Sequence, residues 1–296
     1  MNKIGLHYGY WTREWDTDVI DLVKRASKIG LDVLEMNPPK YMLDMSKDKM
    51  KHLKETAEEH GVELTFCIGF PKEMDMASKD EKIRNAGIEY TKRMLEAVHF
   101  MGGTILSGIV YSYWPASYTH RIEDADKAAA LERGLESVQK VIHVAEDYDI
   151  VYAVEVVNRF EQFMVNNVEE GLDFVRQVNS PKCKLLLDTF HMNIEEDNIA
   201  EALKRAGSHL GHLHVCENNR KIPGQGDHID WPSVFSALRE IGYEGRIVME
   251  PFVKSGGTVG NDLRIWRDLS GGADQKEMDR DITEGLQFLR DLMVKS

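Results

Sequence analysis

Residues 183–216 read CKLLLDTFHMNIEEDNIAEALKRAGSHLGHLHVC, and this stretch decides the predicted fold. It contains two short apolar runs, at 183–188 and 210–216, with a helical pattern over 195–206 between them. Gly207 follows the helical pattern, at a position where helices commonly end. Strand, helix and strand in this order predict two parallel strands with a helix packed against them.

The same alternation extends along the whole chain. Strands are expected at 3–10, 31–36, 62–68, 104–110, 151–157, 183–188, 210–216 and 246–250. Helices are expected at 18–29, 48–60, 83–101, 128–148, 168–178, 195–206, 232–241 and 276–293, where apolar residues recur at three- and four-residue steps. Eight parallel strands close a barrel, so the sequence predicts an α/β fold, a single (β/α)8 TIM barrel.

A doubly wound open sheet is the alternative fold. It is less favoured because no Gly-rich dinucleotide-binding motif follows the first predicted strand. No low-complexity linker divides the chain, which predicts one domain over residues 1–296. The long connection at 252–274, with its paired glycines, is expected to fold over the mouth of the barrel.

Composition narrows the class of protein. The net charge is −13, from 50 acidic and 37 basic residues, which disfavours a nucleic-acid groove or an anionic membrane surface as partner. No run of about 18 apolar residues is present, so no membrane-spanning helix is expected. Cys67, Cys183 and Cys216 are odd in number and widely spaced, which predicts no disulfide framework and a cytoplasmic location.

Four consecutive predicted strands each end in one ionisable residue. These residues are Glu155, Asp188, His214 and Glu250. Barrel active sites lie at the carboxyl ends of the strands, and buried ionisable groups are rare unless they are paired or bind a metal. Three carboxylates and one imidazole suit Mn²⁺, Mg²⁺ or Co²⁺ better than a thiolate-preferring ion. His212 shares a face with His214, but His214 is preferred as the ligand because it lies nearer the strand end.

Polar and aromatic residues follow several of these strands. Glu161, His191 and Arg220 lie in the loops after the fifth, sixth and seventh strands, where they can bind the hydroxyls of a polyol. Trp114 follows the fourth strand, where an indole can stack on the apolar face of a sugar or serve packing or a subunit contact.

The sequence resembles the D-tagatose/D-psicose (D-allulose) 3-epimerases along nearly its whole length. The motifs that carry this resemblance are YSYWP at 111–115, EVVNRFE at 155–161, LDTFHMNIEE at 187–196, HLH at 212–214, NRKIPG at 219–224, MEPFV at 249–253, VG at 259–260 and IWRD at 265–268. DTFHMNIEE and MEPFV together in one chain are highly specific.

The resemblance implies roles for individual residues. The metal ligands would be Glu155, Asp188, His214 and Glu250, and the two acid/base carboxylates would be Glu155 and Glu250. The residues that orient the substrate would be Glu161, His191 and Arg220. The resemblance further implies a free ketose as substrate, Mn²⁺ or Co²⁺ as the ion, with Mn²⁺ expected first, and a homodimer or homotetramer.

The first half of the chain departs from the family pattern. Ile109 stands where the family commonly has Ala, and His7 stands where an aromatic residue is usual. Other departures are Asn37-Pro38-Pro39 and the end of the third strand, from Phe66 to Pro71, which includes Cys67 and Phe70. These positions are expected to meet the far end of the sugar, so the substrate preference is expected to differ from that of typical members.

The resulting expectation is metal-dependent epimerisation at C3 of a free ketose through an enediolate. The alternatives are an aldose–ketose isomerase on the same barrel, a barrel nuclease of the endonuclease IV type, and a non-catalytic sugar-binding or scaffold protein. A nuclease would need a basic groove, which the net charge disfavours. Product analysis separates the isomerase, and turnover with added Mn²⁺ separates the binding protein.

Overall fold

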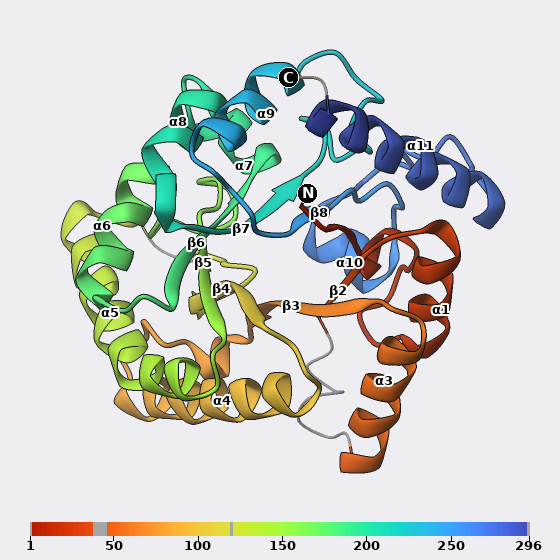
Figure 1. The fold of residues 1–296 in the computed structure, drawn as a ribbon. Helices are drawn as coiled ribbons and strands as arrows, with labels where there is room; N and C mark the ends of the chain where they lie inside the picture. The colour runs from red at the N-terminus through yellow and green to blue at the C-terminus, as the bar shows by residue number, and fades with distance from the viewer. Residues whose placement is uncertain (1, 38–45, 119–120, 295–296) are drawn as a thin grey trace.

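Eight parallel strands form a closed barrel in which each strand pairs with the next and β8 pairs with β1 (Figure 1). The computed structural model describes residues 2–37, 46–118 and 121–294, so Pro38 and Pro39, noted above as departures, lie outside the described residues. The strands are β1 (Ile4–His7), β2 (Val33–Met36), β3 (Glu63–Phe70), β4 (Ile105–Tyr113), β5 (Val151–Glu155), β6 (Cys183–Asp188), β7 (Leu210–Val215) and β8 (Ile247–Met249). The predicted (β/α)8 barrel is therefore confirmed.

Helices surround the barrel on its outside (Figure 1). The α-helices are α1 (Ile20–Ile29), α3 (Lys47–Glu59), α4 (Glu81–Phe100), α5 (Asp124–Asp147), α6 (Val168–Val178), α7 (Thr189–Glu195), α8 (Ile199–Ala206), α9 (Trp231–Glu240), α10 (Gly257–Asp262) and α11 (Gln275–Val294). Three short 3-10 helices are η1 (Tyr8–Tyr10), η2 (Lys72–Met74) and η3 (Gly207–His209). In the described part of the chain, none of the helices combines the length and apolar character needed to cross a membrane.

Two predicted elements differ from the structure. The first strand ends at His7, because Nδ1 of His7 accepts a hydrogen bond from the Gly9 amide and the chain turns into η1. The helix predicted over 195–206 begins later, as α8 at Ile199, and the short helix α7, which ends at Glu195, was not predicted. Asn198 interrupts the pattern, since its side chain accepts a hydrogen bond from the Glu201 amide and caps α8.

A bulge in β4 shapes one wall of the barrel mouth. Gly108 has φ 112°, and a Cβ atom there would lie 2.1 Å from the carbonyl oxygen of Ile68, so only glycine fits. The register between β3 and β4 then shifts, with Gly69 opposite Ile109 and Phe70 opposite Tyr113. From Ile109 to Tyr113, β4 therefore advances by four residues while β3 advances by one, which makes this part of β4 a bulge.

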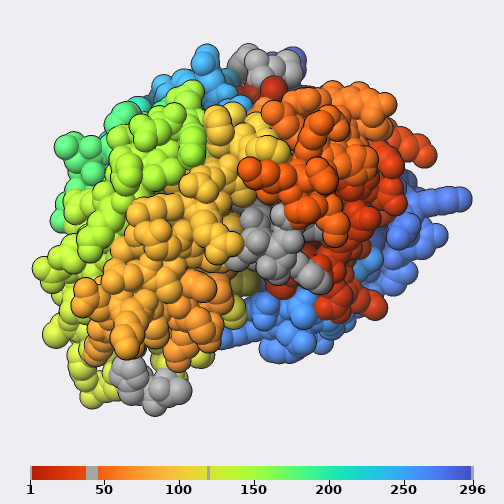
Figure 2. All heavy atoms as spheres, turned by 90° about the horizontal axis from the view of Figure 1, so that it is seen from below, coloured from red at the N-terminus to blue at the C-terminus, as the bar shows by residue number. Residues whose placement is uncertain are grey.

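The segment after β8 is tied to the segment after η1. The Trp15 indole Nε1 donates to Oδ2 of Asp262 at 2.8 Å, and the Trp15 amide donates to Oγ1 of Thr258 at 3.0 Å. Oε2 of Glu14 accepts from the Thr258 hydroxyl at 2.9 Å. Figure 2 shows these two segments, coloured red and light blue, side by side on one face of the molecule.

A partly buried ion-pair network joins strands at the opposite, amino-terminal end of the barrel. Glu63 begins β3, and its side chain is 14% exposed. Its Oε2 accepts from Lys3 at 2.8 Å, and its Oε1 accepts from Nε of Arg246 at 2.7 Å and from Thr104 at 3.3 Å. Lys3 precedes β1 and Arg246 precedes β8, so one carboxylate connects the strands on both sides of the barrel closure.

Candidate active site and metal centre

The four predicted metal ligands meet at the carboxyl ends of β5 to β8. Glu155 and Asp188 are the last residues of their strands, His214 is one residue from the end of β7, and Glu250 directly follows β8. One ligand atom from each of the four lies within 4.8 Å of the others. All four side chains are buried, with Asp188 and His214 fully so. The structure therefore brings these four residues together.

The strand register explains why they converge. Asp188 is paired with His214, and His214 is paired with Val248, two residues before Glu250. Asp188 also caps α7, because its Oδ1 accepts a hydrogen bond from the Phe190 amide at 2.9 Å. Its other oxygen, Oδ2, is left to face the cluster.

These residues fit a hard divalent cation. The cluster offers three carboxylates and one imidazole, the donors that Mn²⁺, Mg²⁺ and Co²⁺ accept. Nδ1 of His214 is buried, 3.4 Å from Oε1 of Glu250, and has no hydrogen-bond partner among the residues that the structure describes. A buried nitrogen left without a partner inside a ring of carboxylates suits a metal ligand.

Arg220 is the cation nearest to this cluster in the structure. Its Nη1 donates to Oδ2 of Asp188 and to Oε2 of Glu250, both at 2.7 Å. The guanidinium carbon lies 3.9 Å from the centre of the Phe190 ring, which holds the group flat above the two acids. Arg220 has φ 65°, in the left-handed region that a tight turn after β7 requires.

The surroundings of Glu155 and Glu250 shift the pKa values of these two carboxylates in opposite directions. Burial raises the pKa of Glu155, and the hydrogen bond from His191 offsets only part of that effect. Burial alone would also raise the pKa of Glu250, but without a metal ion the charge of a protonated His214, together with that of Arg220, outweighs burial and holds this pKa below its usual range. A pair of carboxylates separated in this way is typical of acid/base sites.

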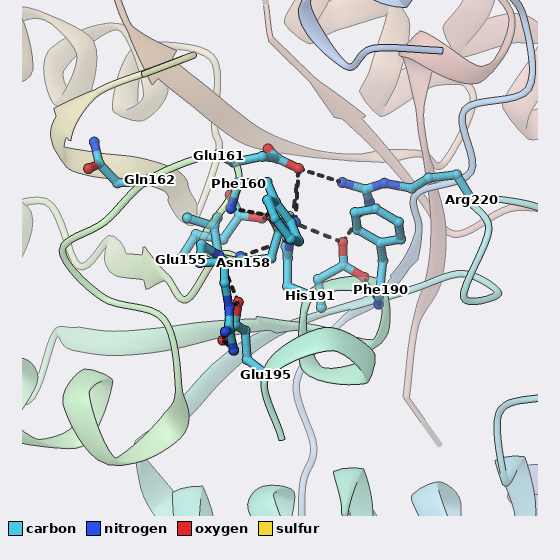
Figure 3. Close-up of polar contacts among 12 residues, drawn as sticks. Glu155, Asn158, Phe160, Glu161, Gln162, Phe190, His191, Glu195 and Arg220 are labelled. Atoms are coloured by element: carbon cyan, nitrogen blue, oxygen red, sulfur yellow. Dashed lines mark hydrogen bonds and ion pairs between the residues drawn. The ribbon is translucent and has the colours of Figure 1, made fainter. Parts of the chain in front are cut away.

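His191 is oriented by its neighbours above the cluster (Figure 3). Its Nδ1 faces the Asn158 amide at 3.2 Å and the Asn158 side-chain nitrogen at 2.7 Å, both of which are donors. Nδ1 therefore accepts, and the ring proton is on Nε2, which lies 3.5 Å from Oε1 of Glu155. The histidine thus presents a donor to the pocket.

Glu161, His191 and Arg220 are polar side chains that line the pocket, and we call them the polar rim. Oε2 of Glu161 accepts from the Trp114 indole at 2.9 Å, and Oε1 of Glu161 accepts from Asn158 Nδ2 at 3.2 Å. Arg220 Nη2 lies 3.9 Å from Oε1 of Glu161 on the other side. Figure 3 shows Asn158, Glu161 and Arg220 around His191.

A pocket opens above this centre. All six residues predicted to contact the substrate line it, and these are His7, Ile109, Trp114, Glu161, His191 and Arg220. Glu155 and Glu250 also face it, together with Asn37, Cys67, Phe252 and Leu263. His7 lies against Phe252, with ring centres 5.4 Å apart, and its Nδ1 is already used by Gly9.

Phe70, which the sequence placed near the far end of the sugar, does not line this pocket. It is fully buried against Tyr90, with ring centres 5.2 Å apart. Phe70 lies where the register between β3 and β4 shifts, directly after Gly69.

Sequence reasoning missed Glu35. This residue is fully buried on β2, and its carboxylate contacts both histidines of β7. The signal was present, because Glu35 lies in the apolar run LDVLEM as Glu155 lies in VYAVEVV. Trp15, which lines the pocket from the loop after η1, was missed as well.

Comparisons with known proteins agree with this fold and site. The family model described as "Xylose isomerase-like TIM barrel" matches residues 23–292. The D-psicose 3-epimerase of Ruminiclostridium cellulolyticum is 42% identical, with 97% of each chain covered. A crystal structure of the D-psicose 3-epimerase of Clostridium cellulolyticum H10 with D-tagatose superposes with a TM-score of 0.95 at 42% identity, covering 98% of this chain and 99% of that one. A D-psicose 3-epimerase crystallised in the presence of D-fructose gives a TM-score of 0.95 at 38% identity, with 98% and 99% covered.

Proposed function

The chain belongs to the xylose isomerase-like TIM-barrel family and, within it, to the ketose 3-epimerases, and from this membership we propose that it interconverts free ketoses by inverting C3. The observation that carries the proposal is the cluster of Glu155, Asp188, His214 and Glu250, two members of which line the pocket. Two of its carboxylates, Glu155 and Glu250, face the pocket from strands three apart in the barrel.

Inversion at C3 requires a proton to leave the carbon next to the C2 carbonyl. One of the two carboxylates, Glu155 or Glu250, removes this proton, and the substrate becomes a planar enediolate. The other carboxylate returns a proton from the opposite face, which reverses the configuration. Inversion needs two bases, one on each face of the reacting carbon. An isomerase with one base has no such group on the opposite face.

The residues that would hold the metal are Glu155, Asp188, His214 and Glu250. When bound there, a divalent ion supplies Lewis acidity that stabilises negative charge developing on the substrate oxygens. We propose Mn²⁺ as the native ion, with Co²⁺ or Mg²⁺ able to replace it, because the donors are three carboxylates and one imidazole.

The polar rim would hold the reacting end of the sugar. His191 presents Nε2–H toward the pocket, while Glu161 and Arg220 offer an acceptor and a donor for hydroxyls. Trp114 would cover the sugar, since its indole is fixed by the hydrogen bond to Glu161. His7 and Ile109 would contact the far end of the sugar.

The proposed substrates are ketohexoses. The relatives are named D-psicose 3-epimerases, and their crystals contained D-fructose or D-tagatose. We therefore assign D-psicose with D-fructose, or D-tagatose with D-sorbose, as the first pairs to assay.

The assembly and location are proposed on separate grounds. Phe160 and Trp266 are large apolar side chains that are 62% and 72% exposed, and Arg264 Nη1 lies 3.3 Å from the Phe160 carbonyl oxygen, which brings the two segments together. An exposed apolar surface of this kind suits the subunit contact of a homodimer or homotetramer. The three free, buried cysteines suit a reducing cytoplasm.

The whole chain is proposed to act as one domain, with the segment 252–274 over the mouth of the barrel. Support comes from Phe252 and Leu263, which line the pocket, and from the bonds of Trp15 to Thr258 and Asp262.

The decisive experiment is turnover of a ketose panel. The protein is stripped with a chelator, shown to be metal-free, and assayed with psicose, tagatose, sorbose and a ketopentose, before and after addition of Mn²⁺ or Co²⁺. We expect C3 epimers as products, with activity only in the metal-loaded samples. Aldoses as products would identify an isomerase instead, and full activity without metal would remove the metal from the proposal.

A further inference from the structure

Glu35 lies inside the barrel beneath the four-residue cluster, with no part of its side chain exposed. It is on β2, across the barrel closure from β7, and is paired with His7 on β1 and Thr65 on β3. A carboxylate in such a place is costly unless donors surround it. The donors that it meets come from β3 and β7.

Both carboxylate oxygens of Glu35 are engaged. Oε2 accepts a hydrogen bond from Thr65 Oγ1 at 2.9 Å and lies 2.7 Å from Nε2 of His212. Oε1 lies 2.5 Å from Nε2 of His214, an ion pair rather than a hydrogen bond of regular geometry. Thr65 and His212 thus fix one oxygen of Glu35 and aim the other at His214.

The contact between Glu35 and His214 determines which ring nitrogen of His214 carries no proton. An ionised carboxylate only accepts, so the nitrogen that faces it carries the proton. Nε2 of His214 faces Glu35, and Nδ1 faces the cluster, 3.4 Å from Oε1 of Glu250. With the proton on Nε2, the lone pair of Nδ1 is free to bind a cation.

We propose that Glu35 is a positioning residue of the metal centre, which keeps the proton of His214 on Nε2 and so makes Nδ1 a metal ligand. This inference rests on the proposed metal-dependent epimerisation. It also gives His212 a role, because that histidine holds the carboxylate of Glu35 in place and is not itself a member of the cluster.

The substitution that tests this is Glu35→Gln, which keeps the shape and removes the charge. A glutamine has one accepting oxygen, whereas Thr65, His212 and His214 present donors to both oxygens of Glu35. If the amide nitrogen faces His214, it favours the tautomer with the proton on Nδ1, which cannot bind metal. Loss of such a partner weakens metal binding by about 10–100-fold.

The matched control is Glu217→Gln. Glu217 is also fully buried, and its Oε1 accepts from the Gly224 amide at 2.8 Å and the Trp231 indole at 2.9 Å. It is not a member of the cluster and does not line the pocket. It therefore reports the general cost of neutralising a buried carboxylate in this barrel.

The measurement is the dissociation constant of Mn²⁺ by competition with a chelator, together with the melting temperature of each metal-free protein. We expect binding to be about 10–100-fold weaker in Glu35→Gln and unchanged in Glu217→Gln. Wild-type affinity in Glu35→Gln overturns the inference, even if the variant melts at a lower temperature. Failure of the wild-type protein to bind Mn²⁺ would instead contradict the proposed function.

A measurement on the wild-type protein covers the case in which Glu35→Gln does not fold. Long-range proton–nitrogen NMR of protein labelled with ¹⁵N in its histidine rings distinguishes Nδ1 from Nε2 without assignment. Trace Mn²⁺ should first broaden an unprotonated Nδ1 in a ring whose proton is on Nε2. If the first nitrogen lost is an unprotonated Nε2, Glu35 does not set this tautomer.

Discussion

A carboxylate oxygen of Glu155 and one of Glu250 lie within 4.8 Å of each other, although the two residues end strands that are three apart in the barrel. Both face the pocket, so a sugar carbon above the cluster would be within reach of both. This relationship makes the two glutamates the candidates for the paired bases.

Replacement of either base should nearly abolish turnover. We expect Glu155→Gln and Glu250→Gln each to lower kcat by about 10²–10⁴-fold, the usual contribution of a general base. Because both also belong to the metal cluster, bound Mn²⁺ is measured on each variant at saturating metal. Glu217→Gln serves as the control and should keep the wild-type rate. A variant that binds metal and turns over normally would exclude that residue from proton transfer.

Solvent label should enter the product at C3. In D₂O, a route with two bases places deuterium on C3, because the base that returns the proton exchanges with solvent. Mass spectrometry and NMR of the recovered ketose locate the label. Deuterium at C1 would indicate an aldose–ketose isomerase, and product without deuterium would argue against the exchange of either base with solvent.

Ile109 should restrict the choice of ketose. It is 4% exposed and lines the pocket, directly after Gly108 on β4. In Ile109→Ala, we expect kcat/KM for psicose, tagatose, sorbose and a ketopentose to change relative to one another by about 10–200-fold, the range for small changes in an apolar pocket. Val110→Ala is the control, because Val110 is equally buried but does not line the pocket. An unchanged ranking in Ile109→Ala would exclude this residue as a determinant.

Glu63 should stabilise the barrel at neutral pH and lose this effect in acid. Burial alone would raise its pKa, but the hydrogen bond from Lys3 and the charge of Arg246 outweigh burial and lower it. A lowered folded pKa means that the stabilisation is present above the unfolded pKa and disappears as the pH falls through the folded pKa. We expect Glu63→Gln to reduce the free energy of unfolding by about 1–3 kcal/mol at pH 7.

The pH dependence provides the check for this effect. Urea unfolding of the wild type and Glu63→Gln is compared at pH 7 and at successively lower pH. The difference should shrink once the pH is below about 4.3, the ordinary pKa of a glutamate. Glu244→Gln, at an exposed site close to Arg246, is the control and should show little difference at any pH. A constant difference for Glu63→Gln would mean that packing, not charge, explains the effect.

The sequence predicted the barrel because each strand is a short apolar run bounded by polar residues and helical patterns. It predicted the positions of Glu155, Asp188, His214 and Glu250 because each ends such a run. Strand ends on one side of a barrel meet wherever the strands are in register, so local patterns were sufficient to bring these four together.

The remaining features depend on contacts between distant segments. Glu35 meets His212 and His214 only because the barrel closes between β1 and β8, and no local pattern encodes that contact. Phe70 lies at the register shift between β3 and β4, a property of two paired strands. The start of α8 was visible in the sequence as Asn198, a capping residue, but the preceding helix α7 was not recognised.

The pairing of Gly5 with Val248 has a consequence for how the molecule is made. Until β8 docks, β1 and β7 are open sheet edges, which favour pairing with other chains. Glu250 directly follows β8 and Glu35 sits beside β1, so the metal cluster and its buried support are assembled in the same late event. The candidate metal cluster is therefore incomplete until β8 has docked, because Glu250 is brought in by that strand.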